Sequence, residues 1–423
     1  MSQKTQELTA PPLRNDCFAL PAGVHWTPVN DALALLRERL GPVTTIETVP
    51  VKAAMGRILA EPLQALRSNP PQPNSAVDGY GFFGAMAPGA HRIPLLDGRA
   101  AAGGSFEGVV PEGFAVRILT GAALPEGVDT VILEEDVNLG TGQIAFNGPL
   151  KQGANARRAG EDFNEGDRIF DVGHEITAAD MALLSASGVH QISVRNRLRV
   201  AVISTGDELV EMGKTAGKDQ IYDANRPMLL NMMTRFGYEA IDLGRVQDSR
   251  AVLSERLDEA AQKADVILTS GGASAGDEDH VSALLKETGS MSLWRVAVKP
   301  GRPLALGLWN GTPVFGLPGN PVAALVCTLI FARPAMALMA GRHWQEPQAY
   351  DLPADFEKSK KPGRREYLRA RVRDGKVQVF ASEGSGRISG LSWADGLVEL
   401  QDGALEIKKG DMARFIPYAS FGL

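Results

Sequence analysis

The chain has 423 residues, and at about 100 to 200 residues per domain this length predicts about three domains rather than one. Its 44 Lys and Arg residues against 50 Asp and Glu residues give a formal net charge of −6, which excludes a diffuse positive field able to bind nucleic acid or an acidic membrane. The two cysteines, Cys17 and Cys327, exclude a disulfide framework and a Cys-based zinc site, and they predict a cytoplasmic protein.

The first part of the chain predicts one helix and then mixed short elements. Residues 1–24 are polar and are predicted to be a flexible tail without a signal sequence. Apolar spacing predicts a helix that starts at Asn30 or Asp31 and stops at Gly41-Pro42. A strand at Val49 and Val51 with a short helix after it should follow, and then a proline-rich loop over 68–74.

The next 100 residues predict a small β domain and a capped helix. Short apolar runs separated by Gly, Pro and Asp fill residues 90–150, which is typical of an all-β unit. A helix is predicted over Ala178–Ala186, because Thr177 is a good N-cap and Gly188 ends the pattern.

From Leu198 onward, apolar strands alternate with amphipathic helices. This order predicts a parallel sheet covered on both faces, with ligand sites at the carboxyl ends of its strands. The longest apolar run, from Pro321 to Ala332, ends at Arg333-Pro334, too soon to span a membrane. After Trp344 the pattern is β again, with a hairpin turn at Asp374-Gly375.

The predicted fold class is therefore multidomain α/β plus β. The expected parts are a tail over 1–24, a split α+β domain over 25–65 and 150–195, a small β-rich domain over 66–149, a three-layer α/β domain over 196–343, and a β domain over 344–423.

Three strands of the α/β region run into loops rich in glycine or proline. Glycine lets backbone N–H groups approach an oxyanion, and a helix starting just afterwards adds its positive end. A single such loop is also what an ordinary strand-to-helix turn needs, but three loops at one sheet edge favour a phosphate site. No loop has the Walker or dinucleotide spacing. The candidate substrate-binding residues in these loops are Thr205, Gly206, Ser270, Gly271, Gly272, Ser274, Gly276, Pro318, Gly319, Asn320 and Pro321.

Acidic residues gather at the same strand ends: Asp207, Glu208, Asp248 and Asp277 to Asp279. Carboxylates beside a phosphate site repel the phosphate unless a hard cation such as Mg²⁺ lies between them. The pattern therefore predicts a metal-bridged phosphate site among these acids. The other interpretation is that Asp277 to Asp279 only stabilise the first turn of a helix.

Fixed cations follow in the segment from Trp294 to Pro303, which reads as an alternating strand. Arg295 and Lys299 are in phase, and Arg302 lies just beyond them in a proline turn. Such cations suit a multiply charged oxyanion. The alternative is an exposed edge strand with scattered charges.

The N-terminal region offers weaker candidates. Asp78 follows a proline-rich loop, where it either orients a substrate or makes an Asx-turn before Gly79. Arg157 and Arg158 precede two acids, an arrangement that is as typical of a surface ion-pair cluster as of an anion clamp. The six histidines are scattered and indicate neither a metal site nor a catalytic triad.

Taken together, these motifs resemble the molybdenum insertase family, the molybdopterin molybdenumtransferases that include bacterial MoeA and the E domain of gephyrin. The matching segments follow the family order from about residue 27 to the end of the chain: NSAVDGY, ILTGAALPEG, RRAGED, VISTGDEL, IYDANR, SGGASAGDED, VKPGRP and GLPGNP.

The resemblance implies an elongated, L-shaped homodimer of four-domain subunits with a C-terminal β-barrel. It also implies insertion of molybdate, the substrate, into adenylylated molybdopterin with release of AMP, with Mg²⁺ as cofactor. An adenylyltransferase and apo-molybdoenzymes would be partner proteins. Nucleic acid and membranes are not expected as partners.

The resemblance also implies roles for individual residues. Asp78 and Thr120 would reach the active site from the partner subunit, and Asp162 would be a further acid there. Glu208, Asp248 and Asp279 would be catalytic acids that hold Mg²⁺ or orient water, which makes them the candidate metal ligands. Lys299, Pro318 and Pro321 would line the pocket. Ser389 lies about where the family has a serine in its last domain. Arg295 and Arg302 stand where members of the family often have lysine, so a planar guanidinium replaces a compact ammonium.

Two other functions compete with this one. A pterin-binding scaffold without turnover would be favoured by loss of the acids or of VKPGRP, and both are present. The related adenylyltransferase step needs neither the split N-terminal region nor the C-terminal domain. The sequence leaves open which acid binds metal and which contacts water.

Overall fold

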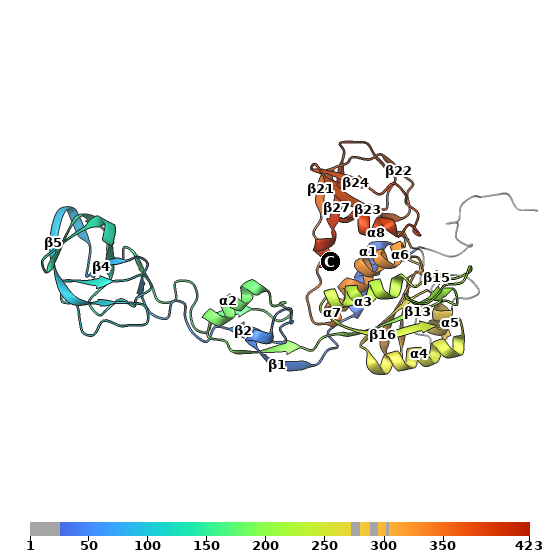
Figure 1. The fold of residues 1–423 in the computed structure, drawn as a ribbon, viewed down its shortest axis with the longest axis horizontal. Coiled ribbons are helices and arrows are strands. Elements are labelled where there is room, and N and C mark those ends of the chain that lie inside the picture. The colour runs from blue at the N-terminus through green and yellow to red at the C-terminus, as the bar shows by residue number, and fades with distance from the viewer. Residues whose placement is uncertain (1–25, 272–279, 288–294, 302–303) are drawn as a thin grey trace, which may run out of the picture. The chain divides into compact units, whose positions relative to one another are not determined.

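The computed structural model describes residues 26–271, 280–287, 295–301 and 304–423 (Figure 1). These residues form two compact units. The first comprises the residues up to Gly41, Leu198–Met339 and Trp344–Leu423, and the second comprises Pro42–Arg197 and Ala340–His343. The predicted tail over 1–24 lies outside the described residues. The helix predicted after residue 30 is confirmed as α1 (Val29–Arg39), which belongs to the first unit.

The second unit is built mainly from β-strands. Residues from both halves of the predicted split domain pair with each other, since β1 (Ile46–Pro50) is antiparallel to β12 (Gln191–Arg195) and β2 (Leu63–Gln64) is antiparallel to β11 (Arg168–Phe170). The predicted small β region is a six-stranded sheet. Its order is β7 (Thr130–Leu133), β4 (Gly79–Phe82), β6 (Ala115–Ile118), β5 (Met86–Ala100), β9 (Gln143–Leu150) and β8 (Val137–Gly140).

Two predictions for local structure in this unit had opposite outcomes. Helix α2 (Ala178–Ala186) is confirmed with its cap, because Thr177 and Asp180 form a reciprocal capping box. The short helix predicted after Val51 is wrong. Only a 3₁₀ turn, Val51–Ala53, forms there, and the apolar side chains beyond it pack in irregular backbone against the core around Leu184.

The first unit contains the α/β sheet. Its order is β16 (Glu239–Val246), β13 (Arg199–Thr205), β17 (Val266–Ser270), β20 (Thr312–Leu317) and β19 (Ala305–Trp309). The first four strands are parallel, as predicted, but the edge strand β19 is antiparallel to β20 because the two are joined by a tight turn at Asn310-Gly311. The parallel order brings the carboxyl ends of β13, β17 and β20 to one edge.

Helices cover both faces of this sheet. Helix α3 (Asn225–Arg235) lies on one face, and α4 (Arg250–Lys263) and α5 (His280–Glu287) lie on the other (Figure 1). The core under α4 and α5 is closely packed, with Leu257, Val281 and Leu285 fully buried against β13 and β17. The three-layer arrangement predicted from the sequence is therefore confirmed.

The apolar run beginning at Pro321 is longer than the sequence predicted. Helix α6 (Pro321–Cys327), a π-helical turn (Thr328–Ala332) and α7 (Arg333–Met339) follow one another without a break. The π-helical turn lies directly before Pro334, which has no N–H for a regular helical hydrogen bond. The 19 residues are long and apolar enough to cross a membrane, but 89% of an 18-residue stretch within them is buried inside the protein. The segment is a core helix of this unit.

The C-terminal region is β-rich, as predicted. A six-stranded sheet contains β18 (Val298–Lys299), β23 (Arg365–Arg373), β25 (Gly396–Leu400), β27 (Met412–Pro417), β21 (Tyr350–Pro353) and, paired with β23, β24 (Lys376–Val379). The hairpin between β23 and β24 turns at Asp374-Gly375, where both φ angles are positive. The smaller elements of the chain are β3 (Asn74–Ser75) with β10 (Ala156–Arg157), β14 (Leu209–Val210) with β15 (Ile221–Tyr222), β22 (Lys358–Lys360) with β26 (Leu405–Ile407), helix α8 (Ser389–Trp393), and 3₁₀ turns at Glu134–Asp136 and Tyr418–Phe421.

Candidate functional site

The three glycine- and proline-rich loops meet at one edge of the α/β sheet. In the strand register Ser204 is the neighbour of Ser270, and Ser270 is the neighbour of Leu317. The loop residues that follow are hydrogen-bonded across the strands, since the Gly271 N–H donates to the Leu317 carbonyl at 3.2 Å. The structure thus brings together the candidates Thr205, Gly206, Ser270, Gly271, Pro318, Gly319, Asn320 and Pro321.

Gly271 shows how closely the loops approach. Its φ is +95°, and a Cβ at this position would lie 2.5 Å from the Thr205 carbonyl oxygen and 2.8 Å from the Thr205 hydroxyl. A Cβ on Gly319 would lie 3.6 Å from the Gly271 Cα, which is ordinary contact. Glycine at 271 is therefore a steric requirement, because the first two loops pack backbone against backbone.

Polar side chains are buried at this edge. The hydroxyls of Ser204, Thr205 and Thr269 and the amide oxygens of Asn225 and Asn320 have no hydrogen-bond partner within the described part of the chain. Burial of an unpaired polar group costs about 1–3 kcal/mol. Such a concentration at the ends of neighbouring strands is typical of a site whose partners are supplied by a ligand.

The acids lie at the same edge. The Asp207 N–H donates to the Asp248 carboxylate at 3.3 Å, and the Asp248 N–H donates to the Asp207 carboxylate at 3.4 Å. The Glu208 carboxylate packs against the Cα of Gly206, where an added Cβ would lie 2.4 Å from Oε2. Glu208 and Asp248 therefore lie at adjacent strand ends, as the sequence predicted.

The third predicted metal ligand, Asp279, lies outside the described residues, together with Gly272, Ser274, Gly276 and Arg302. Among the residues that the structure does describe, no group of three His, Cys, Asp or Glu side chains could hold a metal ion. Mg²⁺ commonly uses only one or two carboxylates and completes its shell with water and phosphate oxygens. Glu208 and Asp248 fit that pattern.

Arg245 is a cation at this edge that sequence reasoning missed. Its guanidinium donates to the Gly206 carbonyl at 3.0 Å and lies 3.9 Å from the Asp207 carboxylate. Arg245 lies next to Ser204 in the register, after an irregularity in the pairing of β13 with β16. The sequence feature that indicates this irregularity is Gly244, whose φ of +75° permits it. The position of Arg245 beside Ser204 depends on how β13 pairs with β16, which the sequence alone does not show.

The predicted cation Lys299 is paired with two carboxylates. Its ammonium lies 2.8 Å from Glu383 and 3.3 Å from Glu366, and Lys358 contacts the same two acids. Partial burial disfavours a charged Lys299, but the hydrogen bond to Glu383 and the charge of Glu366 outweigh it and raise the pKa of Lys299. An oxyanion at Lys299 would compete with these acids.

The segment around Lys299 is less regular than the sequence predicted. Among its described residues only Val298–Lys299 form a strand, and Val296 makes one isolated bridge with Thr27. The Thr27 N–H donates to the carbonyl of Arg295 at 2.8 Å. The role of the Arg295 side chain stays a prediction.

Replacing Lys299 by methionine is expected to lower the free energy of unfolding by about 2 kcal/mol, because the largely buried Glu366 would keep only Lys358, 3.6 Å away. The matched control is Lys263→Met, which breaks an exposed pair with Glu259 and should cost less than about 0.5 kcal/mol. Urea denaturation measures both values. Equal losses in the two variants would show that the Lys299 cluster contributes no more than a surface ion pair.

The segment containing Ser389 adjoins the third loop of the sheet. The Val322 N–H, in the first turn of α6, donates to the Ser385 carbonyl at 3.3 Å. The guanidinium of Arg369 holds the same segment through the carbonyls of Ser382, Gly384 and Arg387. Ser389 begins α8 directly after this segment. The structure therefore brings the Ser389 region to the Pro318–Pro321 turn.

The remaining candidates lie in the second unit. The Asp78 carboxylate accepts hydrogen bonds from the Thr120 N–H at 2.6 Å and the Thr120 hydroxyl at 2.7 Å. These two bonds, the backbone one first, lower the pKa of Asp78 below its usual value. The structure thus joins two candidates that are 42 residues apart in the sequence.

Asp162 contacts Asn69, at the start of the proline-rich segment that leads to Asp78. It accepts a hydrogen bond from the Asn69 side chain at 3.1 Å, and its own N–H donates to the Asn69 carbonyl at 3.0 Å. The nearby Arg158 is involved in a local turn, where its N–H donates to Glu161 at 2.9 Å. Asp162 therefore fixes the start of the proline-rich loop.

Comparisons with known proteins cover most of the chain. Residues 27–188 match the MoeA N-terminal region (domain I and II), residues 201–338 match a probable molybdopterin binding domain, and residues 351–418 match the MoeA C-terminal region (domain IV). A crystal structure of a molybdopterin biosynthesis MoeA protein from Pyrococcus horikoshii has a TM-score of 0.82 at 25% identity, covering 93% of this chain and 100% of that chain.

Curated relatives agree with these matches. A molybdopterin molybdenumtransferase from Haemophilus influenzae is 36% identical over 344 residues, which is 81% of this chain and 85% of the relative. Molybdopterin molybdenumtransferase 2 from Mycobacterium tuberculosis is 31% identical over 86% of this chain and 93% of its own length. Gephyrin from Dictyostelium discoideum is 29% identical over 75% of this chain and 50% of its own length. The chain belongs to the molybdopterin molybdenumtransferase family, transferases of molybdenum cofactor biosynthesis.

Proposed function

We propose that this protein inserts molybdate into adenylylated molybdopterin and releases AMP. The observation that carries the proposal is the shared sheet edge at the ends of β16, β13, β17 and β20. Glycine loops, Glu208 and Asp248 lie there, together with hydroxyls that have no partner among the residues the structure describes. Backbone N–H groups in such loops suit phosphate oxygens, and the acids suit a bridging cation. The names of the relatives support molybdopterin as the substrate that receives molybdenum.

Mg²⁺ is the cofactor that best fits the two acids. Glu208 and Asp248 would hold it, and Asp279 remains a third candidate ligand from the sequence. When bound, the cation would neutralise charge on the phosphoanhydride-like linkage as AMP leaves. Thr205 and Ser270 would donate hydrogen bonds to the phosphate oxygens, because their hydroxyls lie beside the glycine turns. Arg245 would hold the Gly206 loop in place.

A homodimer would complete the site. In this proposal Asp78 and Thr120, with Asp162 as a further acid, act at the strand ends of the other subunit. The hydrogen bonds from Thr120 keep Asp78 ionised and fix its direction, as a substrate-orienting carboxylate requires. We place the protein in the cytoplasm, where an adenylyltransferase would supply its substrate and apo-molybdoenzymes would accept its product.

One assay tests the reaction directly. Purified protein is incubated with adenylylated molybdopterin and Mg²⁺, with or without molybdate, and AMP is quantified by chromatography. Molybdate-stimulated AMP release that stops on chelation of Mg²⁺ is the expected result. Tight pterin binding with no AMP release under any condition would instead identify a scaffold.

Mixing two inactive variants tests the shared site. If Asp78 and Glu208 act in one pocket from different subunits, Asp78→Ala and Glu208→Gln subunits should complement each other, because each heterodimer contains one intact site. After the chains are mixed at equal amounts and exchanged, about a quarter of the wild-type rate should return. A mixture that stays as inactive as its parents would place both residues in the same subunit's site.

A further inference from the structure

The amide of Asn225 connects two of the three loops that form the site. Its Nδ2 group donates one hydrogen bond to Ser270 Oγ and another to the Gly319 carbonyl, each at 2.8 Å. Ser270 ends β17, and Gly319 follows β20. Asn225 is 6% exposed. One buried side chain thereby fixes the distance between the second and third loops.

The first of these bonds also sets the direction of the Ser270 hydroxyl. Ser270 Oγ accepts a hydrogen from Asn225, so its own hydrogen must point away from that amide. Ser270 is 3% exposed and lies at the sheet edge, where the hydroxyls of Thr205 and Thr269 lack partners among the described residues. An asparagine amide at this position therefore makes Ser270 a donor toward the site.

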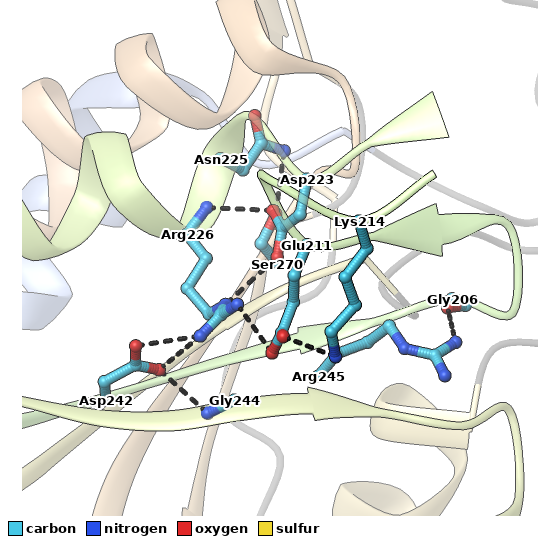
Figure 2. A network of polar contacts seen from close by, with 10 residues as sticks. All are labelled: Gly206, Glu211, Lys214, Asp223, Asn225, Arg226, Asp242, Gly244, Arg245 and Ser270. Carbon is cyan, nitrogen blue, oxygen red and sulfur yellow. Dashed lines mark hydrogen bonds and ion pairs between the residues drawn. The ribbon is translucent and has the colours of Figure 1, made fainter. Parts of the chain in front are cut away.

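Asn225 is itself firmly held at the start of α3. The neighbouring Arg226 forms a fork in which its guanidinium bonds Asp242 on β16 at 2.8 Å and Asp223 at 3.2 Å, and it reaches Glu211 at 3.3 Å (Figure 2). The Asp223 carboxylate also accepts from the Arg226 N–H at 3.1 Å, which stabilises the first turn of the helix. Figure 2 shows Asn225 directed to Ser270 while Arg226 is directed to Asp242.

We propose that Asn225 is a positioning residue that holds the loops after β17 and β20 at a fixed separation and turns the Ser270 hydroxyl toward a phosphate oxygen of the substrate. The inference rests on the proposed function for the identity of that substrate. Asn225 itself does not take part in the chemistry. Its effect should therefore appear mainly in substrate affinity.

The decisive variant is Asn225→Asp, which keeps the size of the side chain. An ionised aspartate cannot donate to the Gly319 carbonyl, and it accepts the Ser270 hydrogen, which reverses the hydroxyl. A protonated aspartate regains one donor. The KM for adenylylated molybdopterin should rise about tenfold or more at pH 8 and fall back toward the wild-type value as the pH is lowered to about 5.5, because burial raises the pKa of a carboxyl group.

Two further variants make the test specific. Asn231→Asp places the same substitution on an exposed position of α3, where Nδ2 bonds the Pro227 carbonyl, and it should keep the wild-type KM at every pH. Ser270→Ala should raise KM by a similar factor to Asn225→Asp. Because the two residues act through one hydrogen bond, the KM of the double variant should be about the same as the KM of either single variant.

The outcomes separate the two proposals. Wild-type protein without AMP release would contradict the proposed function, and equilibrium binding of adenylylated molybdopterin to the same variants then replaces KM as the readout. With active wild-type protein, a KM for Asn225→Asp that matches Asn231→Asp would overturn the positioning role. A defect that does not respond to pH, or effects that add fully in the double variant, would overturn it as well.

Discussion

Glu208→Gln is expected to reduce molybdate-dependent AMP release by about 100-fold or more while leaving the affinity for adenylylated molybdopterin near that of the wild type. The glutamine keeps the shape that packs against Gly206 but removes the negative charge that would hold the cation. The expected loss therefore falls on kcat. Rapid-quench measurement of AMP at saturating substrate determines it.

The control for this prediction is Glu255→Gln, the same change at an exposed position of α4. It should retain full activity, because Glu255 lies on a helix away from the strand ends. Raising the Mg²⁺ concentration should recover part of the lost activity in Glu208→Gln, since the weakened cation site can be refilled by mass action. Full activity of Glu208→Gln at low Mg²⁺ would remove this acid from the mechanism.

Gly271→Ala is expected to lower the free energy of unfolding by about 2–4 kcal/mol and to abolish substrate binding. The new Cβ would meet the Thr205 carbonyl at 2.5 Å in a backbone conformation that alanine adopts only with strain. The obstacle is backbone rather than a movable side chain. The second loop would therefore have to move off the first, which breaks the phosphate site that both loops form.

Gly319→Ala provides the comparison for stability. Its Cβ would make only ordinary contact with Gly271, so the free energy of unfolding should change by less than about 0.5 kcal/mol. Chemical denaturation followed by circular dichroism compares the two variants. If Gly271→Ala were as stable as Gly319→Ala, the close approach of the loops would not be a feature of the folded protein in solution.

The position of the site could be predicted from the sequence because its signals are local. Each of β13, β17 and β20 is a largely apolar strand that ends directly before Gly206, Gly271 or Pro318, and parallel strands place such ends at one edge. The cap of α2 by Thr177 and the turn at Asp374-Gly375 were predictable for the same reason. In these cases the residues that indicate the structure lie within a few positions of the structure that they form.

What could not be predicted depends on residues far apart in the chain. The partners of Lys299, Glu366 and Glu383, lie 67 and 84 positions further along the chain. The sequence therefore showed the positive charge of Lys299 but not the two carboxylates that pair with it. Asn225 stood in a recognised motif, yet its function comes from Ser270 and Gly319, which belong to two other loops. The helix expected after Val51 did not form, because burial of Ala54 and Leu59 in the core overrode an amphipathic pattern.

The link between the Val322 N–H and the Ser385 carbonyl limits how this architecture can be divided. A fragment ending before residue 344 would lose Glu366 and Glu383, and the first turn of α6 would lose a covering segment. In this chain the α/β region is thus covered in part by residues of the C-terminal region. An engineered transfer of the α/β region to another protein should therefore keep more of its native contacts when the C-terminal sheet is transferred with it.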